Sequence, residues 1–406
     1  MRGLIFGVSP TPGDPLPDDA LPAEKALATV PMDLREIPDP ALPADDWVIL
    51  ETKMCGICGS DAKQVFMDGD GDNAMTSLIS FPQVLGHEVI GEIVEAGAAS
   101  GRRVGERVVL NPWLSCGPRG ISPLCPSCQA GEFNLCHHFT EGHLAPGIHT
   151  GNSSTASGGF AELVPAHTSM AIPCPDGVPD EVAVLADPFS VALHSVLRNP
   201  PQAGGKALVY GIGALGLSTL AVLAKLHPDV EVGAVVKWQH QADAAARHGA
   251  KAFFHDPSSA LVDAVADWSQ GTLYHPWEGL PMTFPGGVDI VYDTVAAPST
   301  MEVAVRVLRA RGRLVMTGVS QAGRFEWSPW YFKELNLIGS NAFGVEEIGG
   351  VRKHAIAHYL DWAATGGIDV SDMLTHTFRL DTWRDAFGAI ARQGETGTIK
   401  VAFDYR

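Results

Sequence analysis

The segment LVYGIGALGLSTLAVLA, residues 208–224, gives the clearest indication of a fold in this chain. A short apolar run is followed by Gly211, Gly213 and Gly216, spaced G-x-G-x-x-G, and then by apolar residues at helical spacing. In a strand–turn–helix unit the first glycine makes the tight turn, the second admits a pyrophosphate to the backbone, and the third lets helix and strand pack closely. The segment therefore predicts a dinucleotide site, and the alternative is a compact turn that binds nothing.

The sequence around this segment alternates between strand-like and helix-like runs. KALVYG, VEVGAVV, VDIVYDTV and GRLVMTGV are apolar and β-branched, and helical patterns separate them. This alternation is typical of a parallel, doubly wound sheet, so we expect an α/β protein with a Rossmann dinucleotide-binding domain over residues 189–329. The residues expected to contact the cofactor are Gly211, Gly213, Ala214, Leu215, Gly216, Lys237 and Gly318.

The end of the second strand bears on the choice of nicotinamide. About 20 residues after the third glycine, NAD enzymes usually place Asp or Glu against the ribose hydroxyls. Here the segment reads GAVVKWQHQ, with Val236 near that position and Lys237 beside it. Because this segment contains a cation and no acid, it favours NADP, whose 2′-phosphate is anionic, and NAD is the second choice of cofactor. The alternative is that Lys237 is a solvated side chain at a strand end.

Composition narrows the class of protein. The 406 residues are enough for two or three domains, and 46% of them are apolar. The 28 basic and 46 acidic residues give a formal charge of −18, which disfavours nucleic acid and membrane surfaces as partners. Residues 1–165 are rich in Gly, Pro and short β-like runs and predict a mostly β domain. No apolar run approaches the ~20 residues of a membrane span or suits a signal peptide, so we expect a cytoplasmic protein.

Two regions hold residues that suit a metal. Four of the seven cysteines lie close together in residues 116–136, and in a reducing compartment such a cluster usually means metal or catalysis rather than disulfides. The alternative is that the four cysteines are reduced thiols packed in the protein without a metal. In MCGICGSD (54–61) and VLGHEVIGEIVEAG (84–97), Cys58, His87 and Glu88 are suitable ligands for zinc.

These motifs resemble those of the zinc-dependent medium-chain alcohol dehydrogenases, in particular the polyol and threonine dehydrogenase branch. The family's G-x-C-x-[ST]-D motif matches residues 56–61, its G-H-E motif matches residues 86–88, and the glycine turn falls at the family's position. The resemblance covers nearly the whole chain. It implies a mostly β, GroES-like catalytic domain over residues 1–188 and 330–406, with a structural-zinc lobe at about residues 111–138.

By this resemblance, Cys58, His87 and Asp187 hold a catalytic zinc, with Asp187 coming from LADPFSVALHSV (185–196). Three protein ligands leave one position open for substrate. Asp187 also suits the start of a helix at its Asp-Pro pair, and the two roles are compatible.

The same resemblance assigns the residues around the metal. Ser60 accepts the substrate proton by a hydrogen bond, Glu88 lies beside the zinc as an exchangeable ligand, and Asp61 orients the ligands. Lys63 stands where the family often has a histidine that ends the proton relay, which leaves the outer relay open.

A second, structural zinc is assigned to Cys116, Cys125, Cys128 and Cys136, which makes two zinc ions per chain. The last three keep the family's intervals of two and seven residues, whereas eight residues instead of two separate Cys116 from Cys125. A longer loop costs little extra closure entropy. Four thiolates close the coordination shell, so this zinc has no position for substrate.

The resemblance implies an oxidoreductase that interconverts an alcohol and an aldehyde or ketone, with zinc polarising the substrate oxygen and hydride passing to or from NAD(P). An alternative keeps a tightly bound nicotinamide and catalyses a net non-redox reaction of the dismutase or lyase type. The expected partners are a small alcohol or carbonyl compound and further copies of the chain, in a homodimer or homotetramer. Phe66, Trp113 and Phe343 are candidates for walls of the substrate pocket, which residues 137–154 are expected to border.

Overall fold

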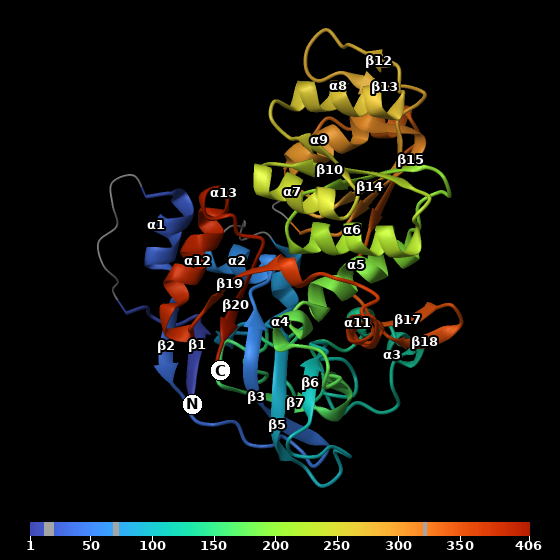
Figure 1. Cartoon of the computed structure of the whole chain (residues 1–406). Coiled ribbons are helices and arrows are strands. Elements are labelled where there is room, and N and C mark those ends of the chain that lie inside the picture. The colour runs from blue at the N-terminus through green and yellow to red at the C-terminus, as the bar shows by residue number, and fades with distance from the viewer. Residues whose placement is uncertain (12–19, 68–72, 320–322) are drawn as a thin grey trace. The chain divides into compact units, whose positions relative to one another are not determined.

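The computed structural model describes residues 1–11, 20–67, 73–319 and 323–406 (Figure 1). Contacts divide the chain into two compact units. Unit 1 is Met1–Pro188 with Phe343–Arg406, and unit 2 is Phe189–Ala342. In the sequence, unit 2 is therefore inserted into unit 1.

Unit 2 is built around one parallel sheet, which confirms the α/β prediction. In spatial order its six strands are β11 (Lys251–Phe254), β10 (Glu231–Val236), β9 (Lys206–Tyr210), β14 (Val288–Asp293), β15 (Leu308–Met316) and β16 (Asn336–Gly339). Their pairings are all parallel. Numbered along the chain, the order 3-2-1-4-5-6 is that of a doubly wound dinucleotide-binding sheet. Such strands are covered on both faces, which explains their nearly continuous apolar runs.

One helix leads into the sheet, and others connect its strands and flank it in Figure 1. They are α5 (Ala186–Arg198), α6 (Ala214–Leu226), α7 (Gln239–Arg247), α8 (Ser258–Ser269), α9 (Pro298–Val307) and α10 (Ser328–Phe332), and a short hairpin joins β12 (Leu273–Tyr274) to β13 (Met282–Thr283). The sequence interpretation puts residues 330–342 in the catalytic domain, but by their contacts they belong to unit 2. The reason is that β16 completes the hydrogen bonding of β15 from Arg313 to Met316.

Unit 1 is mostly β and largely antiparallel. Its main sheet contains β19 (Leu374–Phe378), β20 (Lys400–Asp404), β3 (Trp47–Gly56), β5 (Glu88–Ala96), β6 (Arg107–Leu110) and β8 (Ala171–Pro173), with β7 (Leu163–His167) paired to β3. Smaller sheets contain β2 (Met32–Glu36), β1 (Arg2–Phe6) and β4 (Gln83–Val84), and β17 (Val345–Ile348) with β18 (Val351–His354). Strand β3 is central, because β5, β7 and β20 all pair with it.

The helices of unit 1 are short. They are α1 (Pro22–Thr29), α2 (Gly59–Val65), α3 (Pro126–Ala130), α4 (Asp180–Ala183), α11 (Ala355–Ala364), α12 (Trp383–Ala391) and α13 (Gln393–Thr396). The core of the unit gathers around Trp47, Phe160, Phe387 and Phe403, all nearly or fully buried. In the described part of the chain, no helix combines the length and apolar character that crossing a membrane needs.

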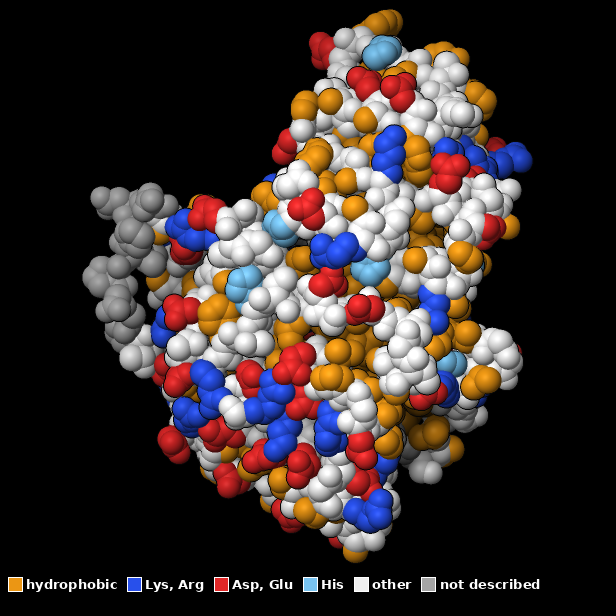
Figure 2. Space-filling model, in the orientation of Figure 1, with side chains coloured by type: hydrophobic (Ala, Val, Ile, Leu, Met, Phe, Trp, Pro, Cys, Tyr) orange, Lys and Arg blue, Asp and Glu red, His pale blue; other side chains and the backbone are white. Residues whose placement is uncertain are grey.

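Charged side chains of both signs are interspersed on the face drawn in Figure 2. The ion pairs of unit 1 include Arg107 with Asp180 and Arg406 with Glu181.

Candidate functional site

One group of metal-ligand side chains forms at the end of β3. Donor atoms of Cys58, His87 and Glu88 all lie within 4.8 Å of one another. Antiparallel pairing places Gly56, the last residue of β3, opposite Glu88, the first residue of β5. The turn that follows β3 therefore lies beside the start of β5. Thiolate, imidazole and carboxylate are the donor types that zinc takes in proteins, and the group therefore has the chemistry of a zinc site.

The glycine before His87 is required by its surroundings. Gly86 has a φ of +90°, and a Cβ added there would lie 2.4 Å from the ring of Phe160 and 2.8 Å from Sγ of Cys55. No other residue type tolerates both this backbone conformation and this close approach. Gly86 thus fixes where His87 enters the group, while Cys55 is buried in β3 outside it.

A buried lysine that sequence reasoning missed completes the surroundings of Glu88. Lys400, the first residue of β20, is 4% exposed; its Nζ forms an ion pair with Glu88 and donates a hydrogen bond to the Ile57 carbonyl at 2.9 Å. Burial alone would lower the pKa of Lys400, but the charges of Glu88 and Cys58 outweigh burial and raise it. The available signal was a lysine inside an apolar strand, IKVAF, where a buried cation needs a partner.

Asp61 contacts two parts of the group. Its Oδ2 accepts a hydrogen bond from the Cys58 backbone N–H at 2.9 Å, and its Oδ1 lies 3.7 Å from Nδ1 of His87. Burial raises the pKa of Asp61, and the nearby His87 opposes that rise. For His87, burial alone would lower the pKa, but the charges of Asp61 and Cys58 raise it well above its ordinary value. Asp61 is placed to orient His87, and Ser60 lies next to it, exposed in the first turn of α2.

Asp187 lies near this group at the start of α5 and is 5% exposed. Burial raises its pKa to about 7; the charge of His87 opposes this rise, and the charge of Glu88 adds to it. Within the described residues, Oδ2 of Asp187 is buried and has no hydrogen-bond partner. A buried carboxylate oxygen without a partner is costly, and a bound cation removes that cost. The residues present therefore fit a metal ion.

Aromatic rings border the metal group on one side. The ring centroid of His149 lies 4.4 Å from that of His87, and Trp113 stands edge-on to His149 at 6.1 Å and to Phe343 at 5.9 Å. Burial, and then the charge of His87, lowers the pKa of His149 to about 3. Phe66 instead packs edge-on against Phe387, with centroids 6.0 Å apart. Sequence reasoning noted the His-rich segment but did not single out His149.

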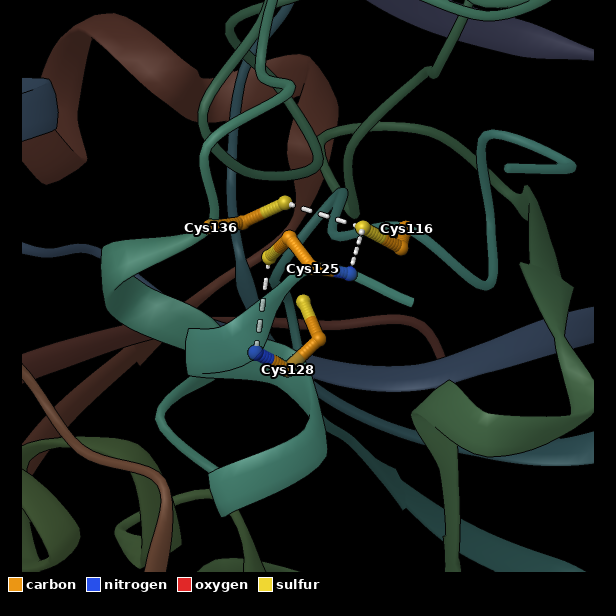
Figure 3. A group of neighbouring side chains, drawn as sticks. All are labelled: Cys116, Cys125, Cys128 and Cys136. Atoms are coloured by element: carbon orange, nitrogen blue, oxygen red, sulfur yellow. Dashed lines mark hydrogen bonds between the residues drawn. The ribbon is translucent and has the colours of Figure 1, made fainter. Parts of the chain in front are cut away.

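The four clustered cysteines form a second group. Cys116, Cys125, Cys128 and Cys136 bring their sulfur atoms together at the start of α3 (Figure 3). Sγ of Cys116 lies 3.6 Å from Sγ of Cys136, and backbone N–H groups donate to sulfur from Cys125, Cys128 and His138 at 3.4–3.5 Å. Such N–H donors favour thiolates. The prediction of a four-cysteine group is confirmed, including Cys116 with its long interval.

Arg119 explains why the long interval is ordered. Its guanidinium is 1% exposed and donates five hydrogen bonds of 2.7–3.1 Å to backbone carbonyls. The acceptors are Leu114, Glu141, Leu144, Ala145 and Gly147. Burial lowers the pKa of Arg119 to about 10. One side chain inside the extra loop thus ties together both ends of the irregular segment around the four cysteines.

The glycine turn of unit 2 has the close contacts that its spacing predicts. Gly211 has a φ of +86°, and a Cβ on it would lie 2.3 Å from Val295. A Cβ on Gly216 would lie 1.9 Å from the Gly211 carbonyl oxygen, so helix α6 can approach β9 only with glycine there. Gly213 precedes α6 as its N-cap and has open space at its Cβ position. Ala214 and Leu215 form the first turn of α6, and a Cβ on Gly318 would lie 2.5 Å from the Thr294 carbonyl oxygen.

The carboxyl end of β10 carries Lys237. Its Nζ lies 5.1 Å from the ring centroid of Trp238, and its backbone N–H donates to the side chain of Gln241 at 2.9 Å. The ring of Trp238 is stacked on that of His240, with 5.8 Å between centroids and 11° between planes. These contacts hold a cation at the strand end, where the cofactor ribose lies in this type of sheet.

Comparison with known proteins defines the class. Residues 44–176 match the alcohol dehydrogenase GroES-like domain, and residues 214–362 match the zinc-binding dehydrogenase domain. The chain is 30% identical to the (R,R)-butanediol dehydrogenase of Saccharomyces cerevisiae over 90% of its length and 93% of that protein. It is 29% identical to an L-threonine 3-dehydrogenase of Rhizobium etli (strain CIAT 652), over 94% and 97% respectively.

A solved structure extends the match. A putative zinc-binding dehydrogenase from Sinorhizobium meliloti 1021, bound to NADP, has 26% identity and a TM-score of 0.69, with 99% of each chain covered. The fold and the two cysteine-containing groups define a zinc-dependent, NAD(P)-dependent dehydrogenase. The chain belongs to the zinc-dependent medium-chain alcohol dehydrogenase family, as its motifs predicted.

Proposed function

We propose that Cys58, His87 and Asp187 hold the catalytic zinc, and that Glu88 lies beside it as a carboxylate held by Lys400. The three donor atoms that lie closest together include Glu88 rather than Asp187. However, Glu88 forms an ion pair with Lys400, whereas Asp187 has a buried Oδ2 that accepts no hydrogen bond among the described residues. The proposal rests on this difference between the two buried carboxylates.

When bound, zinc acts as a Lewis acid that lowers the pKa of a coordinated alcohol and so assists loss of hydride to the nicotinamide. The residues of the chain bind and orient. Asp61 accepts the backbone N–H of Cys58 and lies 3.7 Å from Nδ1 of His87, which places its charge beside both ligands. Ser60 offers its Oγ as the acceptor of the substrate hydroxyl proton. Lys63 follows one turn after Ser60 in α2 and is the candidate for the outer end of the relay.

The zinc-loaded protein tests this function directly. With a secondary alcohol and NADP⁺, reduced nicotinamide should accumulate, and metal analysis should find two zinc ions per chain, one for each ligand group. A purified protein that retains a nicotinamide it never exchanges, and that yields no net reduced cofactor, would support the non-redox alternative instead.

The structure motivates a preference for NADP that rests on Lys237. Charge-assisted hydrogen bonds contribute about 1.5–3 kcal/mol, which corresponds to roughly a 10- to 100-fold preference. Replacing Lys237 with alanine should therefore lower kcat/KM for NADP⁺ by about that factor and leave kcat/KM for NAD⁺ within about threefold. Steady-state kinetics with both cofactors provides the measurement. Lys251→Ala, at the amino end of neighbouring β11, is the matched control and should change neither value.

A wild-type preference for NAD⁺ that survives Lys237→Ala would contradict the 2′-phosphate assignment. It would leave the dehydrogenase assignment intact, because both cofactors serve the same hydride transfer.

We further propose a homodimer or homotetramer in the cytoplasm. Strand β16 is the outermost strand of the unit 2 sheet, pairing only with β15 among the described strands, and an unpaired strand edge is a surface that a second copy can extend. The reduced cysteines of the zinc groups suit a reducing compartment. The substrate is a small alcohol or carbonyl compound.

The Glu88–Lys400 pair yields a stability prediction. Replacing Lys400 with methionine leaves a carboxylate that is 2% exposed without its cation, and breaking a buried pair in this way costs about 3–5 kcal/mol. Urea unfolding should report this loss. Adding Glu88→Gln to Lys400→Met should restore most of it, because the unpaired charge is then removed. If the free energy of unfolding of Lys400→Met lies within about 1 kcal/mol of the wild-type value, the pair contributes little to stability.

A further inference from the structure

The carboxylate of Glu88 lies within reach of the metal group without being needed as a ligand there. Donor atoms of Cys58, His87 and Glu88 lie within 4.8 Å of one another. Zinc binds sulfur, nitrogen and oxygen donors at about 2.0–2.3 Å, so two such donors of one ion lie at most ~4.5 Å apart. The Glu88 carboxylate therefore needs to move little to become a further ligand beside Cys58 and His87.

The absence of a side chain at Gly56 makes room for the Glu88 carboxylate next to Lys400. Gly56 pairs with Glu88 across β3 and β5. A Cβ on Gly56 would overlap Oε2 of Glu88 and lie 3.0 Å from Cε of Lys400. The Glu88–Lys400 ion pair thus occupies the space that a side chain at position 56 would need. At 2% and 4% exposure the two residues have little contact with water, so each charge needs a partner of opposite sign.

The backbone around Lys400 fixes the position of its ammonium group. The Ile57 N–H donates to the Val401 carbonyl at 2.9 Å, and Nζ of Lys400 donates to the Ile57 carbonyl at 2.9 Å. Ile57 immediately precedes the ligand Cys58. Strand β20 therefore attaches to this residue both through its backbone and through the lysine side chain. A cation fixed in this way can hold a carboxylate in one place.

The place of the Glu88 carboxylate matters for a bound metal ion. Three protein ligands leave one position open for substrate, whereas a fourth closes the coordination shell, as in structural zinc sites. A carboxylate and a metal dication attract each other strongly at close range, so a competing cation is needed to keep them apart. Without Lys400, the metal ion would become the cationic partner of Glu88.

We propose that Lys400 is a positioning residue that holds the Glu88 carboxylate out of the metal's coordination shell and so keeps one position open for substrate. Removing the lysine lets Glu88 enter the shell as a fourth protein ligand. The metal is then held more tightly while turnover falls, whereas loss of a purely structural lysine would loosen the site and release the metal faster. The inference rests on the proposed function, because it takes the metal at Cys58, His87 and Asp187 as catalytic.

Cobalt(II) in place of zinc reports on the open position without turnover. The part of its visible spectrum that belongs to this site is identified by its loss in His87→Ala. In wild-type protein this part should shift when imidazole, a small metal ligand, is added. In Lys400→Met it should differ from wild type and not respond to imidazole, because Glu88 occupies the open position. Combining Lys400→Met with Glu88→Gln should restore the response, and Lys400→Arg should retain it. If Lys400→Met does not fold, Lys400→Gln replaces it, because glutamine keeps a donor for the Ile57 carbonyl.

Zinc extraction and kinetics give a second readout. In zinc-loaded Lys400→Met, kcat should fall about 10- to 100-fold, the scale found for groups that surround metal ligands. The rate at which a chelator removes the zinc that His87→Ala lacks should fall as well. The stability loss expected for this variant should be smaller in zinc-loaded than in metal-free protein, because the metal then neutralises Glu88. Lys53→Met is the matched control: Lys53 also lies in unit 1, pairs with Glu51 and Glu92 and is 26% exposed, and its removal should change neither rate.

The outcomes separate this inference from the proposed function. The inference alone is overturned if Lys400→Met still responds to imidazole, or if it releases the zinc faster than wild type. A cobalt spectrum shared by wild type and His87→Ala would overturn the proposed metal site, and the inference with it. If the metal binds at His87 but no alcohol is oxidised with either nicotinamide, the proposed function fails, and the imidazole response still decides the role of Lys400.

Discussion

Replacing His87 with alanine should remove one of the two zinc ions and lower kcat by at least about 1,000-fold. The loss corresponds to about 4 kcal/mol of transition-state stabilisation, the scale of a metal ion acting on a developing oxygen charge. His87 supplies one of the donor atoms that converge within 4.8 Å, and its Nδ1 lies 3.7 Å from Oδ1 of Asp61. Metal analysis and steady-state kinetics on the same preparation provide the two readouts.

Two further variants make this result specific. Cys58→Ser should behave like His87→Ala, because the hydroxyl is a poor substitute for a thiolate ligand. Cys55→Ala is the matched control: Cys55 is buried three residues earlier, outside the ligand group, and its removal should leave both zinc ions in place. Unchanged turnover in a Cys58→Ser protein that has lost one zinc would overturn the catalytic assignment.

Replacing Arg119 with methionine should destabilise unit 1 by roughly 3–5 kcal/mol. Methionine keeps much of the apolar volume but supplies none of the five N–H donors, and each carbonyl left without a partner costs about 1–3 kcal/mol unless water reaches it. Urea unfolding measures the loss. The rate at which a chelator extracts the second zinc should also rise, because Arg119 orders the loop between Cys116 and Cys125.

Arg103 provides the control for this experiment. Its side chain is 87% exposed and forms an ion pair with Glu106, so Arg103→Met should change stability by less than about 0.5 kcal/mol. Lysine carries a point charge that cannot reach five acceptors at once. The loss of stability in Arg119→Lys should therefore lie between the losses in Arg103→Met and Arg119→Met. A loss below 1 kcal/mol for Arg119→Met would contradict the role given to this guanidinium.

Much of the fold was predictable because its signals are local. The glycine turn, strands β9, β10 and β14, and the helices between them follow from spacing and apolar runs within a few residues. The run LNLIGSN, residues 335–341, is compatible with an outer strand of the sheet, and β16 forms there beside β15. The domain boundary at residue 330 had no such local signal, because the pairing of β16 with β15 decides to which unit these residues belong.

In the candidate site, too, the residues with local sequence signals were predictable, and those placed by contacts with distant residues were not. Cys58, His87 and the four clustered cysteines lie in motifs with readable spacing, and the structure brings each set together. Lys400 could not be paired from sequence, because 343 positions separate it from Ile57, whose carbonyl it contacts. His149 lies in an irregular loop whose shape depends on Asn152 and on the bridge to Trp113, and neither periodicity nor spacing encodes such contacts.

The placement of Lys400 has a consequence for how the protein is made. Glu88 and its metal-binding neighbours leave the ribosome early, whereas the cation that neutralises Glu88 is about 300 residues further on, after all of unit 2. At ~5–20 residues per second, about 15–60 s pass before β20 can dock beside β3. During that interval the nascent chain presents a cysteine, a histidine and two acids without their lysine, a more anionic and more open ligand set than that of the finished fold. Metal capture and choice of metal ion can therefore differ between the growing chain and the completed protein.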